Sequence, residues 1–327
     1  MWILGSPLRE FSYFILPGLL ALAVSFLFPN LGETSLFYAL LGTALVDNGH
    51  VHTTLWRTYL HPAERSSHKA YLLVPISLLI LFFIWHYTGA PYLWNFVVYS
   101  TLFHHVRQFY GTSKWYQSLN KRTDKYSDAC LYILLILPLI AFHFRPEINL
   151  SIYSERDIFF YPNTLGLKIT VVLFFGCLGA WLIHEGMLWR KGIREVNRVL
   201  SIAWPVSVYS YCFFFGENMT QILFPLFFVH GIAYFGMLGR SLHRTQASRF
   251  QSETKAIIIV IVTAFFLGGF NSYLENLMLE ENERSLLLMS SMTTLLLTPL
   301  FCHYIFDAII WKKSHREAKL VFSTNQA

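Results

Sequence analysis

Charged residues and cysteines are both scarce in this sequence. Charged residues make up only 13% of the 327 residues, whereas hydrophobic residues make up 54% and the mean hydropathy is +0.44. The sequence provides neither a disulfide framework nor CxxC metal spacing, because its few cysteines stand apart inside apolar runs. They are Cys130, Cys177, Cys212 and Cys302. We also find no internal repeat and no low-complexity tract. This composition is typical of a multi-pass membrane protein.

Long apolar runs recur along the whole chain. They predict an all-α fold, a polytopic transmembrane bundle of about ten helices that forms a single transmembrane domain over residues 1–327, with no separate soluble domain. The first run lacks a small-residue cleavage site, so we expect it to be a retained helix. The expected spans are 11–28, 35–56, 71–88, 92–110, 129–144, 165–188, 199–216, 220–239, 256–274 and 286–311.

Basic residues gather in alternate loops between these spans. The remaining loops are poor in basic residues or acidic, although Arg145, Arg156 and Lys168 dilute one of them. This alternation predicts that both termini are cytoplasmic. It also explains the net charge of +6 better than nucleic-acid binding does, because the charges form no single patch. We expect a bacterial inner membrane rather than the endoplasmic reticulum. The basic loop residues are Arg57, Arg65, Lys69, Lys114, Lys121, Arg122, Lys125, Arg190, Lys191, Arg194, Arg198, Arg240, Arg244, Arg249, Lys255, Lys312, Lys313, Arg316 and Lys319.

The stretch 45–61 places polar residues inside an apolar run. Ionisable groups at membrane depth are costly and usually carry function. Asp47 and His50 share one helix face, whereas His50 and His52 are about 200° apart and cannot both face inward. The Asp47–His50 pair is therefore either a metal-binding pair or a polar pair that bonds to neighbouring helices.

Every even-numbered span brings at least one histidine to a similar depth. Counting from the first loop cation at 1.5 Å per residue places four of them about 10–15 Å inside the membrane. These four are His50, His104, His230 and His303. We expect them to share one metal ion, with His105, Asp47 or Asp307 adjacent. Gln108 and Tyr234 are candidate hydrogen-bond partners of the ligands. Whether His52 and His184 belong to this site stays open.

Other polar residues suggest simpler roles. His86 and His143 lie near the opposite membrane face. The loop histidines His61, His68, His243 and His315 are expected at the solvated surface. Arg107 stands beside the fourth span's histidines, and it either snorkels to the surface or holds an anionic head group.

Three segments carry a family resemblance, namely VDNGHVH, FHHVRQFYG and FFVHGIAYFG. Single histidines from several membrane helices resemble the integral-membrane non-haem iron enzymes, which include fatty-acid desaturases and hydroxylases. The sequence has no HxxxH box and departs from the desaturase pattern. It is more similar to the Brp/Blh type of β-carotene dioxygenase. The resemblance concerns architecture, and it implies iron as the metal and a membrane-dissolved substrate.

Two classes of function follow from these patterns. The first is an intramembrane metal-dependent oxygenase or desaturase-type oxidoreductase, with iron as the expected transition metal and a lipid or isoprenoid as substrate. The alternative is a histidine-lined transporter for protons or a transition metal. The missing repeat and the displacement of the polar layer from the midplane favour the enzyme. The oligomeric state stays open.

Overall fold

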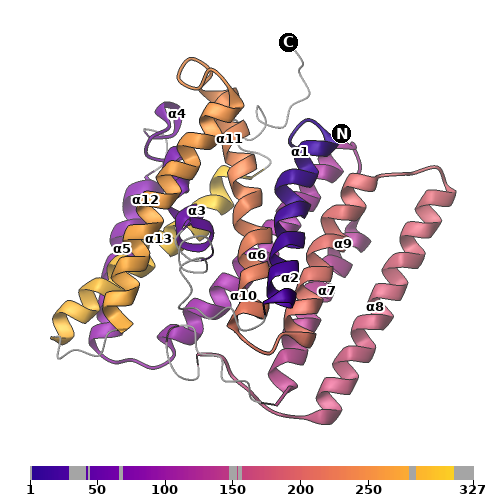
Figure 1. The fold of residues 1–327 in the computed structure, drawn as a ribbon, viewed down its shortest axis with the longest axis horizontal. Coiled ribbons are helices and arrows are strands. Elements are labelled where there is room, and N and C mark those ends of the chain that lie inside the picture. Colours follow the sequence, from indigo (N-terminus) through magenta and orange to yellow (C-terminus); the bar gives the residue numbers. More distant parts are fainter. Residues whose placement is uncertain are drawn as a thin grey trace. The chain divides into compact units, whose positions relative to one another are not determined.

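The chain is built from helices. The computed structural model describes residues 2–28, 42, 45–65, 69–146, 153, 157–279 and 285–312, and every regular element among them is helical (Figure 1). Eight helical segments are long and apolar enough to cross a membrane. They are Pro7–Leu27, Ala70–Tyr87, Lys125–Phe144, Thr164–Arg190, Val196–Phe215, Met219–Thr245, Glu253–Met278 and Leu286–Ile310. Each of these eight corresponds to one predicted span.

For the two other predicted spans, the observed helices differ from the predicted bounds. The second, 35–56, lies partly outside the described residues, and its described end forms α3 (Asn48–Thr53) and the 3-10 helix η3 (Thr54–Trp56). The fourth is α6 (Leu93–Leu119), which continues well beyond the predicted end at 110. Helices can continue past the hydrocarbon layer because charged residues are solvated there.

The chain divides into two compact units, which we describe separately. The first contains residues 1–31 and 94–230, and the second contains residues 32–93 and 231–327. The boundary at 230 falls inside the π-helix η5 (Phe228–Ile232). The prediction of a single transmembrane domain stays a prediction.

In the first unit, α7 is the central packing partner. It packs against α8, α9 and η4, while α10 packs against α2 (Figure 1). Asn163 caps α8 and Asn218 caps α10, each by accepting a backbone N–H of the first turn. The helices of this unit are α1 (Pro7–Glu10), η1 (Phe11–Ile15), α2 (Leu16–Leu27), α6, α7 (Lys125–Phe144), α8 (Thr164–Arg190), α9 (Val196–Ser210), η4 (Tyr211–Phe215) and α10 (Met219–Phe227).

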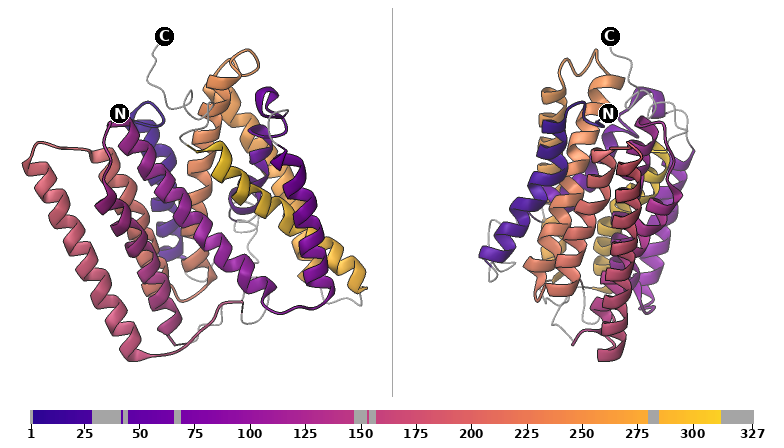
Figure 2. Two further views of the ribbon diagram at one scale, coloured as in Figure 1. Left: turned by 180° about the vertical axis from the view of Figure 1, so that it is seen from behind. Right: turned by 90° about the vertical axis from the view of Figure 1, so that its right-hand side faces the viewer.

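In the second unit, two helix pairs carry the packing. α13 runs beside α5, yellow and purple in Figure 2, and α12 packs against α3 and α11. Ser285 caps α13 by accepting the N–H of Leu288. The helices of this unit are α3, η3, α4 (Pro62–Arg65), α5 (Ala70–Tyr87), α11 (Ala233–Thr245), α12 (Glu253–Leu279) and α13 (Leu286–Ile310).

Four residues expected in loops are buried, and one of them is Arg57, which follows η3. Arg198 is in the first turn of α9 and is buried, and Arg240 is buried within α11. His61 is also buried, and its Nε2 lies 3.1 Å from Thr245 Oγ1. The prediction of a surface position is therefore wrong for His61. The three arginines are buried because helices extend past the apolar runs and pack around these positions. His68 and His315 lie outside the described residues.

Candidate metal centre

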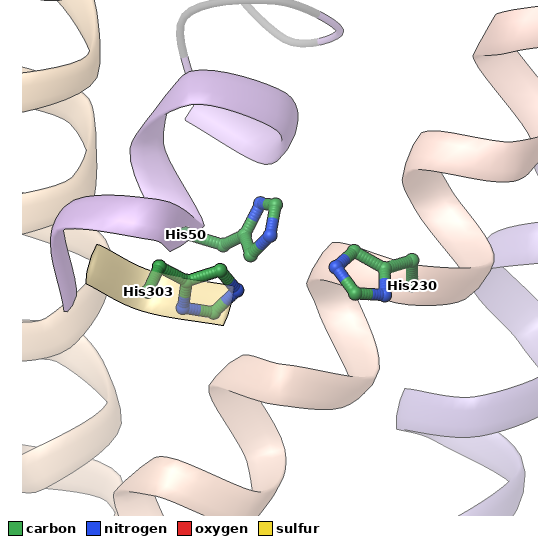
Figure 3. A group of neighbouring side chains, drawn as sticks. All are labelled: His50, His230 and His303. Carbon is green, nitrogen blue, oxygen red and sulfur yellow. The ribbon is translucent and has the colours of Figure 1, made fainter. Parts of the chain in front are cut away.

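Two buried histidines meet in the second unit. His50 of α3 and His303 of α13 have ring centroids 5.0 Å apart, and a ring nitrogen of one lies within 4.8 Å of a ring nitrogen of the other. Figure 3 draws both side chains and shows their rings side by side. The residues come from helices far apart in the sequence, so tertiary packing alone brings them together.

A chain of hydrogen bonds fixes the His303 ring. Thr54 Oγ1 lies 2.6 Å from His303 Nδ1 and 2.9 Å from the hydroxyl of Tyr234. That hydroxyl donates to Asp307 Oδ1 at 2.9 Å. Since the Tyr234 proton goes to Asp307, the Tyr234 oxygen accepts from Thr54, and Thr54 in turn accepts from His303 Nδ1–H. The chain therefore places the proton of neutral His303 on Nδ1, so Nε2 is its unprotonated ring nitrogen.

His50 is held in a comparable way. Its Nδ1 lies 2.6 Å from the carbonyl oxygen of Val46, one turn earlier in the chain. Gly231 packs closely against the same carbonyl oxygen. A Cβ atom added to Gly231 would lie only 2.5 Å from it. Glycine is therefore required at 231 for the backbone carrying His50 to come this close.

These contacts match those of metal-binding histidines. Ligating imidazoles almost always donate the other ring N–H to a carboxylate, a backbone carbonyl or water. His50 has the carbonyl of Val46, and His303 is linked to Asp307 through Thr54 and Tyr234. Asp307 Oδ1 is also 3.7 Å from His303 Nδ1, so Asp307 is placed to orient His303. The spacing of the ring nitrogens of His50 and His303 could hold a metal ion, and imidazole ligands suit transition metals.

The other polar residues of α3 face α12. Asn48 Nδ2 donates to Ser272 Oγ at 3.0 Å and to Glu275 Oε2 at 3.1 Å, and Asp47 is close enough to Glu275 to interact with its charge. His52 is hydrogen-bonded to Asn271, which also lies on α12. Asp47 and His52 therefore belong to a second polar group on this side of α3.

The first unit holds the remaining predicted histidines. His104 and His105 are neighbours on α6, and His230 lies on η5 (Figure 3). The ring of His230 is 5.1 Å from that of His104 and stacks on that of His105 at 4.0 Å. Gln108 Nε2 donates to the backbone carbonyl of His230 at 3.1 Å, which ties α6 to η5. The structure thus gathers all three rings in one buried group.

A separate charged cluster lies at the α7–α8 end of the first unit. Asp124, His184 and Glu185 each offer an atom within 4.8 Å of the others, which is a spacing that could hold a cation. Arg198 nevertheless donates to both oxygens of Glu185, at 2.8 and 2.6 Å, and His184 Nε2 lies 3.0 Å from Asp124. An arginine already compensates these carboxylates, so the cluster is an ion-pair network. His184 belongs to this network through its contact with Asp124.

The pKa of Asp124 reflects this network. Burial alone would raise this pKa, but the hydrogen bond from His184 and the charge of Arg198 oppose burial and hold the pKa below its usual value. Asp124 therefore stays ionised and caps α7 by accepting the N–H of Ser127 at 3.1 Å.

Sequence reasoning missed two partners of the histidines. Thr54 and Val46 carry no recognisable signal, since one is an ordinary hydroxyl residue and the other acts through its backbone. Their positions one turn after and one turn before His50 were the only available indication. Tyr234, a predicted hydrogen-bond partner of the ligands, is linked to His303 through Thr54 and also bonds to Asp307.

No protein-family model, no curated protein and no solved structure matches this chain. Fold and composition nevertheless define its class. With eight helical segments that can cross a membrane, the chain is a multi-pass integral membrane protein. Within the described residues it carries buried histidine groups whose spacing could hold a metal ion.

Proposed function

We propose that this protein is a metal-dependent membrane oxidoreductase that uses iron and oxygen on a lipid or isoprenoid. The observation that carries the proposal is the buried His50–His303 pair, with the hydrogen-bond chain that runs from His303 to Asp307. The resemblance to Brp/Blh-type and desaturase-type enzymes points in the same direction.

Packing alone explains this arrangement poorly. Histidine and aspartate in a membrane segment are costly, and residues that serve only to join helices can do so with fewer ionisable groups. The Nδ1 atoms of both histidines are engaged, which is the orientation that metal ligation requires. A set of imidazole ligands with a nearby carboxylate is more typical of an iron site than of a closed structural zinc site.

Each residue then has a definite task. His50 and His303 bind the metal through Nε2, and iron bound there would supply Lewis-acid and redox chemistry toward oxygen. Thr54 and Tyr234 keep the His303 ring in one orientation. Asp307 accepts the hydrogen bond of the Tyr234 hydroxyl at Oδ1 and balances the positive charge that ligation brings to the His303 ring. The prediction that His104 and His230 bind the same ion stays a prediction.

The transporter alternative has one observation in its favour. The second polar group, in which Asn48 bonds to Ser272 and Glu275, extends ionisable residues along α12. A series of carboxylates and histidines in membrane helices can relay protons. This group ends in a carboxylate and not in an imidazole pair, so it supports proton movement more than transition-metal transport.

Oxygen uptake separates the two proposals. We expect protein in lipid nanodiscs to consume oxygen when it is loaded with ferrous iron and given an apolar lipid extract. His303→Ala should abolish this uptake, because one ligand is lost while every helix remains. His86→Ala is the matched control. His86 of α5 bonds to Ser290 of α13, the helix that also carries His303, but this contact lies away from the His50–His303 pair. Proton or metal flux into proteoliposomes that His303→Ala suppresses, without oxygen uptake on any lipid, would overturn the enzyme proposal.

A further inference from the structure

An exposed arginine interrupts an apolar surface of the first unit. Arg107 lies on α6 with its side chain exposed. Phe103, one turn earlier, is 61% exposed, and Ile133 and Ile136 of α7 are 45% and 41% exposed. Exposed side chains of this kind face lipid in a membrane protein. A guanidinium beside them is costly unless something compensates its charge.

Two tyrosines hold the guanidinium in place. Arg107 Nη1 donates to the hydroxyl of Tyr132 at 2.6 Å, and its guanidinium carbon lies 5.2 Å from the ring centroid of Tyr110. The rings of Tyr110 and Tyr132 are themselves 4.9 Å apart. The guanidinium is thus fixed by one hydrogen bond and one cation–π contact, and its orientation is set before any ligand arrives.

The charge of Arg107 has no carboxylate partner among the residues that the structure describes. Other cations of this unit do have one: Lys114 pairs with Asp128 at 2.9 Å, and Arg198 pairs with Glu185 at 2.6 Å. A guanidinium carries five N–H donors, and Tyr132 takes one of them. The Tyr132 oxygen accepts from Arg107, so its own O–H can donate to a further acceptor. The site therefore offers a positive charge with donors on two side chains.

The site lies within reach of the lipid head groups, because Arg107 is only seven residues, about 10 Å, before Lys114, the first loop cation after the fourth span. Tyr132 stands one turn after Asp128, the last acidic residue of α7, and the chain then continues as an apolar run. One turn is about 5–6 Å along the helix axis. Arginine at this depth can reach the level of the phosphates, because its stem is long enough to carry the charge outward.

We propose that Arg107, Tyr110 and Tyr132 form a binding site for the phosphate of an anionic phospholipid in the surrounding leaflet. The planar guanidinium matches two phosphate oxygens, and the Tyr132 hydroxyl supplies a third bond. The occupant is a membrane lipid, since the exposed apolar side chains beside the site would contact its acyl chains. This site is independent of the proposed oxidoreductase activity.

Native mass spectrometry of the full-length protein tests the proposal. We expect phosphatidylglycerol to bind with defined stoichiometry and phosphatidylcholine to bind much more weakly. Arg107→Gln should weaken phosphatidylglycerol binding about tenfold or more, and Tyr132→Phe by a few-fold, since charged hydrogen bonds are the stronger ones. Arg190→Gln is the matched control, because Arg190 is an exposed arginine at the end of α8. It should leave binding unchanged.

Three outcomes would overturn the proposal. The first is equal phosphatidylglycerol binding by the wild type and Arg107→Gln. The second is equal binding of the two lipids, which would mean that Arg107 only snorkels. The third is full competition by glycerol phosphate, which would indicate a free-phosphate site. If Arg107→Gln does not fold, Tyr132→Phe and Arg107→Lys decide. Both must weaken binding, because the lysine keeps the charge but loses the planar fork.

Discussion

At the scale of single residues, the account depends on how His303 is held. Its ring is buried between α3 and α11, and Thr54 and Tyr234 link it to Asp307. His303, Thr54 and Tyr234 each donate to the next member of this chain and Asp307 accepts at its end, so removing one hydroxyl changes the hydrogen bonding of its neighbours. Partners of this kind tune metal affinity without touching the metal.

Tyr234→Phe tests this directly. The change removes the hydroxyl that accepts from Thr54 and donates to Asp307, while the ring keeps its packing. We expect iron affinity to fall about 10–100-fold, the range known for hydrogen-bond partners of metal ligands. Chelator competition measures it. Tyr59→Phe is the control, since the Tyr59 hydroxyl donates to the Tyr71 backbone, outside this chain. Equal iron affinity of Tyr234→Phe and Tyr59→Phe would show that the Tyr234 hydroxyl does not influence metal binding.

At the scale of elements, the position of α3 depends on the close approach between Gly231 and the backbone at Val46, just before α3. Gly231→Ala would put a methyl group 2.5 Å from the Val46 carbonyl, which holds the His50 ring. We expect a loss of about 1–3 kcal/mol in stability, as overpacking typically causes, together with weaker metal binding. Gly269→Ala on α12 is the control, because a Cβ there meets nothing within 4 Å. It should leave stability unchanged or raise it by about 1 kcal/mol. Thermal unfolding and metal content in detergent measure both, and similar behaviour of the two variants would contradict this account.

The ion-pair network joins α7, α8 and α9 through Asp124. The pKa of Asp124 is lower in the folded protein than its ordinary value of 3.8. Its ionised form therefore stabilises the fold above about pH 3.8, and this stabilisation is lost as the pH falls through the lower folded value. Asp124→Asn should lower the free energy of unfolding by about 1–3 kcal/mol at pH 7.

The pH dependence identifies the cause of that loss. The difference between wild type and Asp124→Asn should shrink below pH 3.8, because the wild-type carboxyl then becomes neutral as well. Asp128→Asn should cost less than about 1 kcal/mol, because its partner Lys114 is 31% exposed. A constant difference between the wild type and Asp124→Asn across the acidic range would mean that shape, and not charge, explains the effect.

At the scale of the whole molecule, the loops predict the topology. Basic residues lie in alternate loops, so reporter fusions after Ser118, Glu195 and Ala247 should report cytoplasm. Fusions after Ala90 and Glu280 should report the opposite side. Reversal of any one fusion would show that a span has been miscounted.

The helices could be predicted from the sequence because apolar run length decides whether a segment crosses a membrane. α5 and α13 begin and end within one residue of the predicted spans. Helix ends in the polar layer could not be predicted, since they depend on tertiary partners such as those of Arg198. The shared depth of the histidines predicted which of them could bind a metal. It could not predict that Thr54 contacts His303 or that Val46 contacts His50. The π-helix around His230 also has no local signal, although such turns are frequent at functional sites.

Metal analysis of the purified protein tests the central claim most directly. Protein produced with sufficient iron should carry about one iron per chain, because the sequence predicts a single site for the deep histidines. His50→Ala and His303→Ala should reduce the iron to background while the thermal transition remains, and His86→Ala should keep the wild-type content. A wild-type protein that carries no transition metal, or that carries as much as His303→Ala, would contradict the account.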